Sequence, residues 1–518
     1  MKSDSIVIVG GGTAGFMTAT TLIKLFPNKK VSLIESPRIK TVGVGESTIV
    51  QFRKWMGLVG IKDEDFMKEC NASYKFNIRF TDFHKKDNTY FDYPFGATFV
   101  PDKNKFTIWY LKKMAYPDTP LTDFADSFCP FMALVNNNAV HENKNNELGE
   151  WDFYKETAWH FDATKFGLWL KDKICIPNGL KHITATVKDI KTNDKGIEHI
   201  LLDNGDEIKA DLFIDCTGFK SLLLGGALKE EFTSYNDILP NNKAIATHIP
   251  YKNKDKELVG YTNCTAIENG WVWNIPLWES VGTGYVYSDK YVTEEQALKE
   301  FKKHLKKNGV DVKDLSFNHL DMRIGMHKRI FVKNVCAIGL SAGFIEPLES
   351  NGLYTVHEFL SKLISLFKRD NISQFDKDGF NIVCKGTFHS WAEFVALHYA
   401  LSERDDTPYW RDNMDREYVN SYYNMLTNSS SDMQKTITGK FLEGAFEDVA
   451  GIRYIATGMN WFPTSKEQIM YINTLHDLDL KPFEPSFDEM DKFKKQWNEA
   501  VKDSPTLYKY LKDNIYKT

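Results

Sequence analysis

The chain has 518 residues, 42% of them hydrophobic and 14% aromatic, which is ample for a large globular core. Its formal net charge of -5 argues against a nucleic-acid-binding protein and against a basic protein of membrane surfaces. No apolar stretch is long enough to span a membrane, and the first apolar strand is too short for the core of a signal peptide. We therefore expect a cytoplasmic protein that binds neither nucleic acid nor membrane.

The cysteines argue against two kinds of site. Their number is odd and no two form a Cys-x-x-Cys pair, so the pattern fits neither a disulfide framework nor a zinc site. We interpret all of them as reduced core residues and predict no metal site. They are Cys70, Cys129, Cys175, Cys216, Cys264, Cys336 and Cys384.

Residues 5–35 read as a strand, a glycine-rich turn, a helix and a second strand that ends at Glu35. The Gly-x-Gly-x-x-Gly pattern in such a turn is the dinucleotide fingerprint, because glycines permit the tight turn, the close approach of a pyrophosphate and the packing of the helix. The phosphates then lie at the positive end of the helix, and the acid accepts hydrogen bonds from a ribose. We predict that a nucleotide cofactor is bound by Gly10, Gly12, Thr13, Ala14, Gly15 and Glu35.

A second glycine-rich loop follows at residues 41–49 and carries an acid and two hydroxyl groups. Such a loop can approach a ring system or a halide, or it can be an ordinary turn, and the residues alone leave both open. We include Gly45 among the cofactor-binding candidates.

Lys75 lies in residues 72–80, where alternating polar and apolar side chains predict a strand. Its neighbours Tyr74 and Phe76 are unusual company for an ammonium group. Burial there would favour the neutral, nucleophilic amine. A strand lysine that points into water is the ordinary alternative, because lysines are seldom buried.

From about residue 81 to 180 the pattern is irregular and rich in aromatic residues, and Asp162 is a candidate N-cap for a helix. Residues 183–214 predict a β-meander with a hairpin turn at 203–206. It closes on an apolar strand and Asp-x-Thr-Gly at Asp215, which would return the chain to the nucleotide, as a two-part flavin domain requires. A plain strand and turn is the alternative.

Trp271 and Trp273 lie two residues apart and therefore on one face of a predicted strand, which Pro276 ends. Taken alone, such a tryptophan pair is usually part of a core. The same strand includes Ile275.

A buried strand at residues 334–338 runs into a third glycine-rich turn at Gly339, another cofactor-binding candidate. Polar residues then crowd the turn before a helix at 353–367, and exposed amides in such a turn make an anion nest. Glu346, just before a proline, reads as a structural cap, whereas Glu349 has no such explanation.

After residue 368 the chain reads as helical, with aromatic residues gathered at 391–399, 418–423 and 454–462. We place a core at 1–360, with the aromatic insertion at 81–180, and a helical part at 361–518 that shapes a pocket or only stabilises the core.

Together these motifs resemble the flavin-dependent tryptophan halogenases. Four features carry the resemblance: Gly10-x-Gly12-x-x-Gly15, Ser73-Tyr74-Lys75, Trp271-x-Trp273-x-Ile275-Pro276 and Pro347-Leu348-Glu349-Ser350. The match covers about residues 5–355. It implies an α/β fold, with a Rossmann-type FAD-binding domain of the flavin monooxygenase type and a mainly helical C-terminal part on the substrate side.

The resemblance also implies a mechanism. Reduced FAD and oxygen convert a bound halide to hypohalous acid, which moves to Lys75. Lys75 activates it by hydrogen bonding or holds it as a haloamine, and delivers the halogen to an electron-rich aromatic carbon. Glu349 acts as the acid-base residue, and the wall of Trp271, Trp273, Ile275 and Pro276 keeps the substrate away from the flavin.

One position departs from the family pattern, which has Glu-Ser-Thr-Gly where this chain has Glu349-Ser350-Asn351-Gly352. The resemblance places the halide against Ser350, Asn351 and Gly352. Asn tolerates a left-handed backbone and keeps its N–H, so the site is expected to persist. We expect a preference for bromide or iodide, which are less hydrated and easier to oxidise than chloride.

Two other functions are weighed against this one. A flavin monooxygenase that hydroxylates an aromatic shares the fingerprint but has no use for Lys75 with Glu349. A non-catalytic flavin-fold binding protein would show no turnover. Because no second nucleotide fingerprint is present, we expect a separate reductase to supply reduced FAD in a transient encounter. The substrate is expected to be an indole, a phenol or a larger aromatic, and a homo-oligomer is left open.

Overall fold

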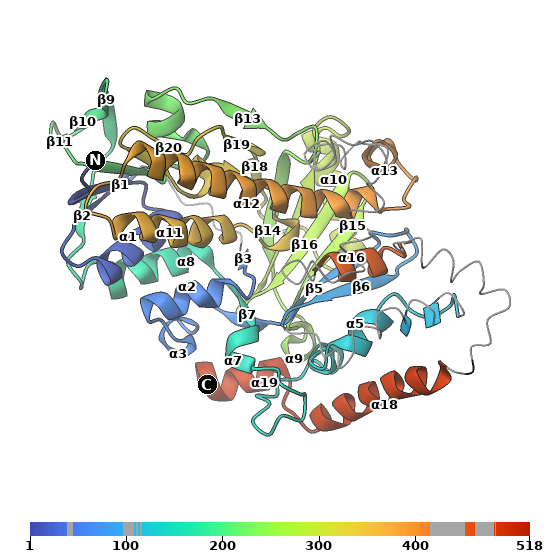
Figure 1. The fold of residues 1–518 in the computed structure, drawn as a ribbon. Coiled ribbons are helices and arrows are strands. Elements are labelled where there is room, and N and C mark those ends of the chain that lie inside the picture. Colours follow the sequence, from blue (N-terminus) through green and yellow to red (C-terminus); the bar gives the residue numbers. More distant parts are fainter. Residues whose placement is uncertain are drawn as a thin grey trace.

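The structure is a computed structural model, and it describes residues 1–38, 45–96, 108–109, 112–113, 116–414, 451–461, 481 and 483–517 (Figure 1). Three parts of the sequence interpretation lie outside these residues: positions 41–44 of the second glycine-rich loop, the aromatic group at 418–423, and Phe462.

A six-stranded sheet carries the nucleotide fingerprint. Its order is β20-β21-β12-β1-β2-β8, and all neighbours are parallel except β20 and β21. The strands are β1 (Ser5–Val9), β2 (Lys30–Glu35), β8 (Lys181–Thr184), β12 (Leu212–Asp215), β20 (Phe331–Val332) and β21 (Val335–Ala337). Helix α1 (Thr13–Leu25) links β1 to β2, and the middle strands are apolar and buried as parallel strands require. The predicted Rossmann-type α/β fold is confirmed.

The predicted meander at 183–214 is only partly one sheet. Its first and last strands, β8 and β12, join the parallel sheet, while β9 (Val187–Asn193), β10 (Gly196–Leu202) and β11 (Glu207–Ile208) form a separate antiparallel one. The predicted turn at 203–206 connects β10 and β11, with Gly205 at φ +93°.

A seven-stranded sheet holds the tryptophan pair. Its order is β18-β14-β17-β16-β15-β5-β6. The strands are β5 (Asn77–Thr81), β6 (Tyr90–Pro94), β14 (Lys243–Ile249), β15 (Tyr261–Ile267), β16 (Gly270–Pro276), β17 (Val281–Tyr287) and β18 (Asn318–Asp321). A small sheet, β13 (Phe232–Ser234), β19 (Gly325–His327) and β22 (Gly343–Phe344), adjoins the turn at 339–349.

A three-stranded antiparallel sheet lies between the two large ones. It consists of β3 (Glu46–Ser47), β7 (Ala158–Phe161) and β4 (Ser73–Lys75), with β7 in the middle. The single strand predicted at 72–80 is therefore wrong in one respect. The chain leaves the small sheet at Phe76, whose N–H donates to the carbonyl of Gly260, and enters the seven-stranded sheet as β5. Lys75 is thus the last residue of one sheet before the chain joins another.

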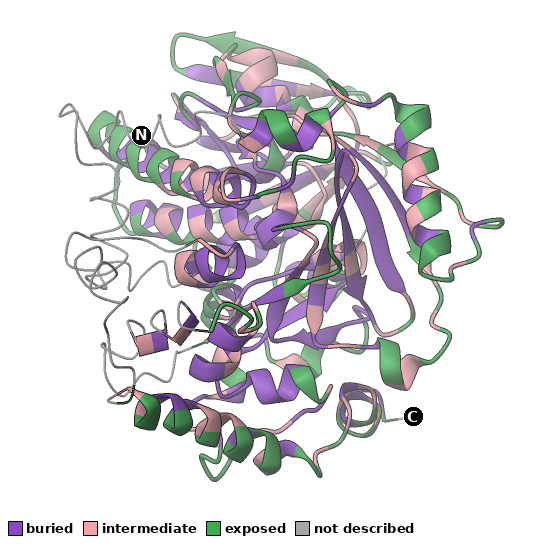
Figure 2. Cartoon of the chain, turned by 90° about the vertical axis from the view of Figure 1, so that its right-hand side faces the viewer, coloured by how far each residue is buried: buried purple, intermediate pink, exposed green. Residues whose placement is uncertain are grey.

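The remaining helices of the first 360 residues surround the sheets. They are α2 (Phe52–Val59), α3 (Asp63–Phe66), α5 (Asp123–Phe128), α6 (Met132–Asn136), α7 (Phe153–Glu156), α8 (Ala163–Trp169), α9 (Lys254–Glu257) and α10 (Glu294–Lys307). Asp162 caps α8, as predicted, because its Oδ1 accepts the N–H of Lys165 at 2.9 Å. Figure 2 shows buried strands in the interior and exposed outer faces on the helices.

The C-terminal part is helical where the structure describes it, as predicted. It contains α11 (Tyr354–Phe367), α12 (Gln374–Ala400), α13 (Pro408–Met414), α16 (Gly451–Gly458), α18 (Glu484–Val501) and α19 (Leu507–Leu511). Helix α12 contacts α11 and also β20 and α16, so it spans from the nucleotide sheet to the aromatic side of the molecule (Figure 1).

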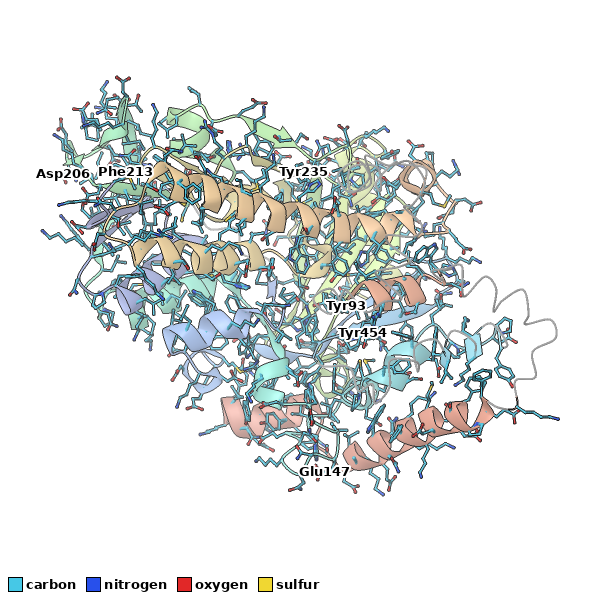
Figure 3. All side chains as sticks on the ribbon, in the orientation of Figure 1. Tyr93, Glu147, Asp206, Phe213, Tyr235 and Tyr454 are labelled. Atoms are coloured by element: carbon cyan, nitrogen blue, oxygen red, sulfur yellow. The ribbon has the colours of Figure 1, made fainter. Side chains whose placement is uncertain are left out.

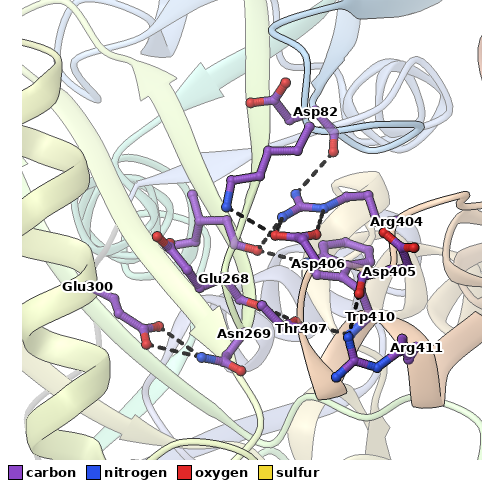
Figure 4. Close-up of polar contacts among 12 residues, drawn as sticks. Asp82, Glu268, Asn269, Glu300, Arg404, Asp405, Asp406, Thr407, Trp410 and Arg411 are labelled. Atoms are coloured by element: carbon purple, nitrogen blue, oxygen red, sulfur yellow. Dashed lines mark hydrogen bonds and ion pairs between the residues drawn. The ribbon is translucent and has the colours of Figure 1, made fainter.

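Arg404 fastens the end of α12 to the core (Figure 4). Its buried guanidinium donates to the carbonyls of Asp82 and Ile267 and to both carboxylate oxygens of Asp406, and it lies over the ring of Trp410 at 4.4 Å. A buried cation needs this degree of pairing. The network fixes the last turns of α12, which carry His398 and Tyr399.

All seven cysteines are buried and unpaired, which confirms their interpretation as core residues. Among the described residues, no helix combines the length and the apolar character that crossing a membrane would require.

Candidate active site

Lys75 is completely buried, so the ordinary alternative of a lysine in water is excluded. Its ammonium donates to the Ser350 Oγ at 2.7 Å and to the Thr48 carbonyl at 2.9 Å, and it lies 4.7 Å from the centre of the Phe95 ring. Burial lowers the pKa of Lys75 to about 7, against the opposing influence of Cys264, Glu349 and Glu46. The side chain is therefore an amine that changes charge near neutrality.

Glu349 lies at the end of a short 3-10 helix, Pro347–Glu349, and is also completely buried. Burial raises the pKa of its carboxyl group, while His398 and Lys75 act to lower it. The Nε2 of His398 lies 2.7 Å from Glu349 Oε1. Lys75 and Glu349 each influence the other's pKa, so the structure brings the two predicted catalytic residues together.

Glu346 faces a different environment from Glu349. Its carboxylate accepts the hydroxyl of Tyr399, which itself accepts the side-chain N–H of Asn241 at 2.9 Å. The interpretation of Glu346 as a cap is wrong, because its side chain does not bond to the helix start. It instead binds α12 to the turn.

The backbone of the turn after Glu349 differs from expectation. Ser350, not Asn351, takes the left-handed conformation, at φ +57°. The turn therefore does not depend on the ability of Asn351 to adopt the left-handed conformation. Within the described part of the chain, the backbone N–H groups of Asn351 and Gly352 donate to no acceptor.

The Asn351 side chain is 2% exposed, and its Oδ1 and Nδ2 atoms have no hydrogen-bond partner among the described residues. Leaving a buried amide unpaired is costly. The turn thus presents a polar side chain and two backbone donors to one small volume, which suits a small anion.

Glu46, on β3, closes the other side of this turn. A Cβ atom placed on Gly352 would lie only 2.7 Å from Glu46 Oε1, so any larger residue there would require the Glu46 carboxyl group to move. Removal from water raises the pKa of Glu46 to about 8, and Lys75 opposes this rise. The half-buried acid is a functional candidate that sequence reasoning noticed only as part of a loop.

The fingerprint turn has the shape that a cofactor pyrophosphate requires. A Cβ on Gly10, which has φ +118°, would lie 2.1 Å from the Cys216 carbonyl oxygen, and one on Gly15 would lie 1.9 Å from the Gly10 oxygen. Gly12 is the residue before α1, and its backbone is extended. The helix start is therefore open to a phosphate group, and these residues fit FAD.

Two other predicted cofactor residues adjoin this turn. A Cβ on Gly339 would lie 2.9 Å from the Ala14 Cβ, so the third glycine-rich turn packs directly on the fingerprint. Thr13 is held by its hydroxyl, which donates to the Ala163 carbonyl at 2.8 Å.

The two predicted acids already have protein partners. Glu35 Oε2 accepts Lys171 at 2.9 Å and lies 2.7 Å from His182 Nε2. Both carboxylate oxygens of Asp215 accept hydrogen bonds, from the N–H and hydroxyl of Thr217 and from the N–H groups of Leu223 and Leu224. Asp215 therefore organises the turn after β12.

In the predicted tryptophan wall, Trp271 and Trp273 lie on one strand, β16, with 6.2 Å between their ring centres. Ile275 lies against Gly45, where an added Cβ would be 3.7 Å from its Cγ2. The Pro276 carbonyl accepts the hydroxyl of Ser73 at 2.6 Å. The wall therefore runs from the second glycine-rich loop to the strand of Lys75.

Aromatic side chains continue from Lys75 toward the helical part. The ring of Tyr93 lies 6.1 Å from the ring of Phe95. It also packs on the ring of Tyr454 of α16, at 6.0 Å (Figure 3). Burial raises the pKa of Tyr93, with a further contribution from Glu349. Tyr93 of β6 thus lies near Glu349, and Tyr454 of α16 packs on Tyr93.

Sequence reasoning missed several polar residues around Lys75. They are Glu46, Ser47, His160, Thr262 and His398, all brought to the site by strand pairing or by the packing of α12. The available signals were polar side chains inside otherwise apolar stretches, such as His160 in Ala158-Trp159-His160-Phe161.

Comparison with known proteins decides the family. The family model for tryptophan halogenase matches residues 5–470. The chain belongs to the tryptophan halogenase family. This halogenase is 35% identical to tryptophan 6-halogenase SttH of Streptomyces toxytricini over 439 residues, which covers 80% of this chain and 81% of that protein. It is 32% identical to tryptophan 7-halogenase RebH of Lentzea aerocolonigenes, over 80% of this chain and 79% of that protein.

Solved structures agree with the sequence comparison. The structure of VirX1 without ligand superposes on this halogenase with a TM-score of 0.91 at 39% identity, covering all of both chains. The crystal structure of SttH gives a TM-score of 0.81 at 30% identity, and the superposition covers 98% of this chain and 99% of SttH. The protein is accordingly a flavin-dependent halogenase of aromatic substrates, an oxidoreductase that uses FADH2, a halide ion and O2.

Proposed function

We propose that this halogenase transfers a halogen to an electron-rich aromatic carbon of an indole or phenol through Lys75. The observation that carries the proposal is the placement of Lys75: fully buried, held by Ser350 and Thr48, and near both an aromatic ring and Glu349. A buried amine that is neutral part of the time can accept a halogen from hypohalous acid as a haloamine, and a charged one can activate the acid by hydrogen bonding.

Glu349 is proposed as the acid-base residue. A carboxyl group whose pKa is raised is a stronger base when ionised, and the carbon that receives the halogen must lose a proton. His398 at 2.7 Å supplies a group that can share this proton.

Ser350, Asn351 and Gly352 are proposed to bind the halide. Among the residues that the structure describes, the N–H groups of Asn351 and Gly352 have no acceptor and the Asn351 amide has no partner, which supports this assignment. Because the site is buried, it favours the halide whose removal from water costs the least free energy. We therefore propose a preference for bromide or iodide over chloride.

FAD is proposed to bind at the fingerprint turn, with its pyrophosphate at the start of α1 and Glu35, Gly45 and Gly339 around it. The reduced cofactor supplies, with oxygen, the oxidising power that turns halide into hypohalous acid. The tryptophan wall is proposed to separate that chemistry from the organic substrate, because the strand that carries Trp271 and Trp273 runs between the second glycine-rich loop and the strand of Lys75. A separate reductase in the cytoplasm would provide the reduced flavin.

Free tryptophan is one candidate substrate, since SttH and RebH are named as tryptophan halogenases. The aromatic side chains around Tyr93 and Tyr454 suit any flat, electron-rich ring. Other indoles and phenols are therefore included.

The test is product mass spectrometry with a panel of indoles and phenols, a flavin reductase, oxygen and each halide in parallel. We expect a halogen mass shift that is lost in Lys75→Ala, while flavin oxidation continues. Product from Lys75→Ala would remove the lysine from the mechanism. A gain of oxygen would indicate a monooxygenase, and no turnover of any kind would indicate a binding protein.

A further inference from the structure

Five hydrogen-bonded side chains run through the interior from Lys75 to a buried histidine. Lys75 Nζ donates to Ser350 Oγ at 2.7 Å, and Ser350 Oγ lies 3.0 Å from Ser47 Oγ. Ser47 Oγ lies 2.7 Å from Thr262 Oγ1, which lies 2.9 Å from His160 Nε2. Every member is at most 5% exposed.

The chain continues past the imidazole to a fixed end. His160 Nδ1 lies 3.4 Å from Ser73 Oγ, and the Ser73 hydroxyl donates to the Pro276 carbonyl at 2.6 Å. A carbonyl only accepts, so the Ser73 proton is committed and its oxygen is left to accept from Nδ1. His160 therefore carries its proton on Nδ1, and Nε2 has a free lone pair.

The position of the His160 proton determines which group donates and which accepts in every hydrogen bond back to Lys75. Because Nε2 accepts, the Thr262 hydroxyl donates to it and accepts from Ser47, which in turn accepts from Ser350. At the other end an ammonium only donates, so Ser350 accepts from Lys75. Lys75 and His160 therefore require the same assignment of donors and acceptors. Each group donates its hydrogen bond to the next group on the way from Lys75 to His160.

The fold brings these hydrogen-bonded side chains together from five segments of the sequence. Ser47, His160 and Ser73 face one another across β3, β7 and β4, where Ser47 and Ser73 both pair with His160. Thr262 comes from β15 in the seven-stranded sheet, and Ser350 from the left-handed position after the 3-10 helix. No single segment of sequence contains this arrangement.

We propose that these hydroxyl groups form a proton relay that takes a proton from the Lys75 ammonium to His160 and later returns it. The inference rests on the role of Lys75 in the proposed function. In the forward step the N–H bond of Lys75 that faces Ser350 breaks, each hydroxyl takes one proton and passes on its own, and an N–H bond forms at His160 Nε2. One positive charge moves from Lys75 to His160, and no other reactant is needed.

The relay gives the buried lysine a route to its nucleophilic form without access to water. Two of its N–H bonds would otherwise stay committed to Ser350 and Thr48. Burial, and then the charge of Lys75, hold the pKa of His160 well below its usual value, so the ring begins neutral with Nε2 free. When the proton leaves Lys75, the part of this penalty that comes from the Lys75 charge disappears, while the part from burial remains, so His160 holds the proton only transiently before it returns. The groups that face Lys75 from neighbouring elements are Glu46, Cys264 and Glu349, and only Lys75 has a charge effect on His160.

The test compares variants that keep or break the relay while preserving shape. Thr262→Val removes the hydroxyl, and Thr262→Ser keeps it. His160→Gln can still accept from Thr262 and donate toward Ser73, but it cannot take up a proton. We expect the single-turnover rate of halogen transfer to fall about 10²-fold in Thr262→Val and His160→Gln, and to recover in Thr262→Ser.

Solvent isotope measurements distinguish a relay from positioning. In mixtures of H2O and D2O the wild type should give a curved dependence of rate on deuterium content, because several protons move together, and Thr262→Val should lose the curvature. If His160→Gln matches the wild type in rate and isotope effect while the wild type halogenates, the chain only positions Lys75 and the relay is overturned.

A second readout does not depend on activity. Nitrogen-15 NMR of the His160 ring in the apoprotein should show the neutral form with the proton on Nδ1. A proton on Nε2 would reverse the order of the chain and overturn the relay, whatever the substrate. Failure of the wild type to halogenate any substrate would instead count against the proposed function.

Discussion

His398 Nε2 lies 2.7 Å from Glu349 Oε1, and neither side chain is exposed to solvent. His398 Nδ1 lies 3.1 Å from the Phe394 carbonyl and 3.2 Å from that of Val395, two groups that only accept. Nδ1 therefore carries a proton, and Nε2 is the ring nitrogen next to the carboxyl group. The two atoms are close but not aligned for a hydrogen bond, so a rotation of either side chain would let Glu349 and His398 share one proton.

Glu349→Gln should lower the rate of halogen transfer by two to four orders of magnitude, about the range for lost acid-base catalysis. Glutamine keeps the size of the side chain but holds no acidic proton for His398. Single-turnover kinetics with a good substrate would measure the effect.

The matched control is Glu346→Gln, which keeps an oxygen to accept the Tyr399 hydroxyl. It should retain most of the activity. A large loss in Glu346→Gln together with a small one in Glu349→Gln would exchange the roles assigned to the two acids.

Lys75→Met should change how stability depends on pH. Burial lowers the pKa of Lys75 from 10.5 to about 7, so between these values the unfolded chain binds a proton that the folded chain does not. The contribution of Lys75 to stability therefore rises with pH, by at most about 1.4 kcal/mol per unit. Burial raises the pKa of Glu46 to about 8, so below pH 8 the contribution of Glu46 to stability instead falls as the pH rises.

The comparison is accordingly made between pH 9 and 10, about one unit or more above the pKa of Glu46, where this acid is mostly ionised in both states. The melting temperature of Lys75→Met relative to wild type should fall over this interval. Lys68→Met, which removes an exposed lysine, should show no such trend. A constant difference for Lys75→Met would mean that the lysine keeps its proton in the folded protein.

Asn351→Thr should move the halide ranking toward chloride. The substitution removes the buried amide, which has no hydrogen-bond partner in the described part of the chain, and introduces threonine, the residue that the family resemblance implies at this position. Competition reactions with equal chloride and bromide, read as the ratio of the two products by mass spectrometry, would report the shift. An unchanged ratio would show that the Asn351 side chain does not set halide preference.

Gly10→Ala should abolish FAD binding and destabilise the nucleotide sheet, because the new Cβ would lie 2.1 Å from the Cys216 carbonyl oxygen at a φ of +118°. Flavin titration by fluorescence and thermal unfolding would measure both effects.

Gly57→Ala provides the contrasting control. Gly57 lies in α2 with no atom within 4 Å of an added Cβ, so alanine there should stabilise the helix by about 0.5–1 kcal/mol and leave FAD binding unchanged. Normal FAD binding by Gly10→Ala would argue against the fingerprint as the cofactor site.

The sequence by itself determined the nucleotide fold and the identity of the two central catalytic candidates. The fingerprint unit was predictable because its strand, turn and helix are local, and their residue types follow from backbone geometry at Gly10 and Gly15. Lys75 and Glu349 were found because each is a polar residue that its own neighbourhood does not explain.

Only the tertiary structure decided what surrounds these two residues. The relay from Lys75 to His160 joins residues 47, 75, 160, 262 and 350, and the partner of Glu349 lies 49 positions away on α12 (398 − 349). Their proximity follows from pairing among separate strands and from helix packing, which depend on the whole chain. The left-handed backbone at Ser350 was likewise misplaced from sequence, because that conformation is imposed by its contacts and not by residue type.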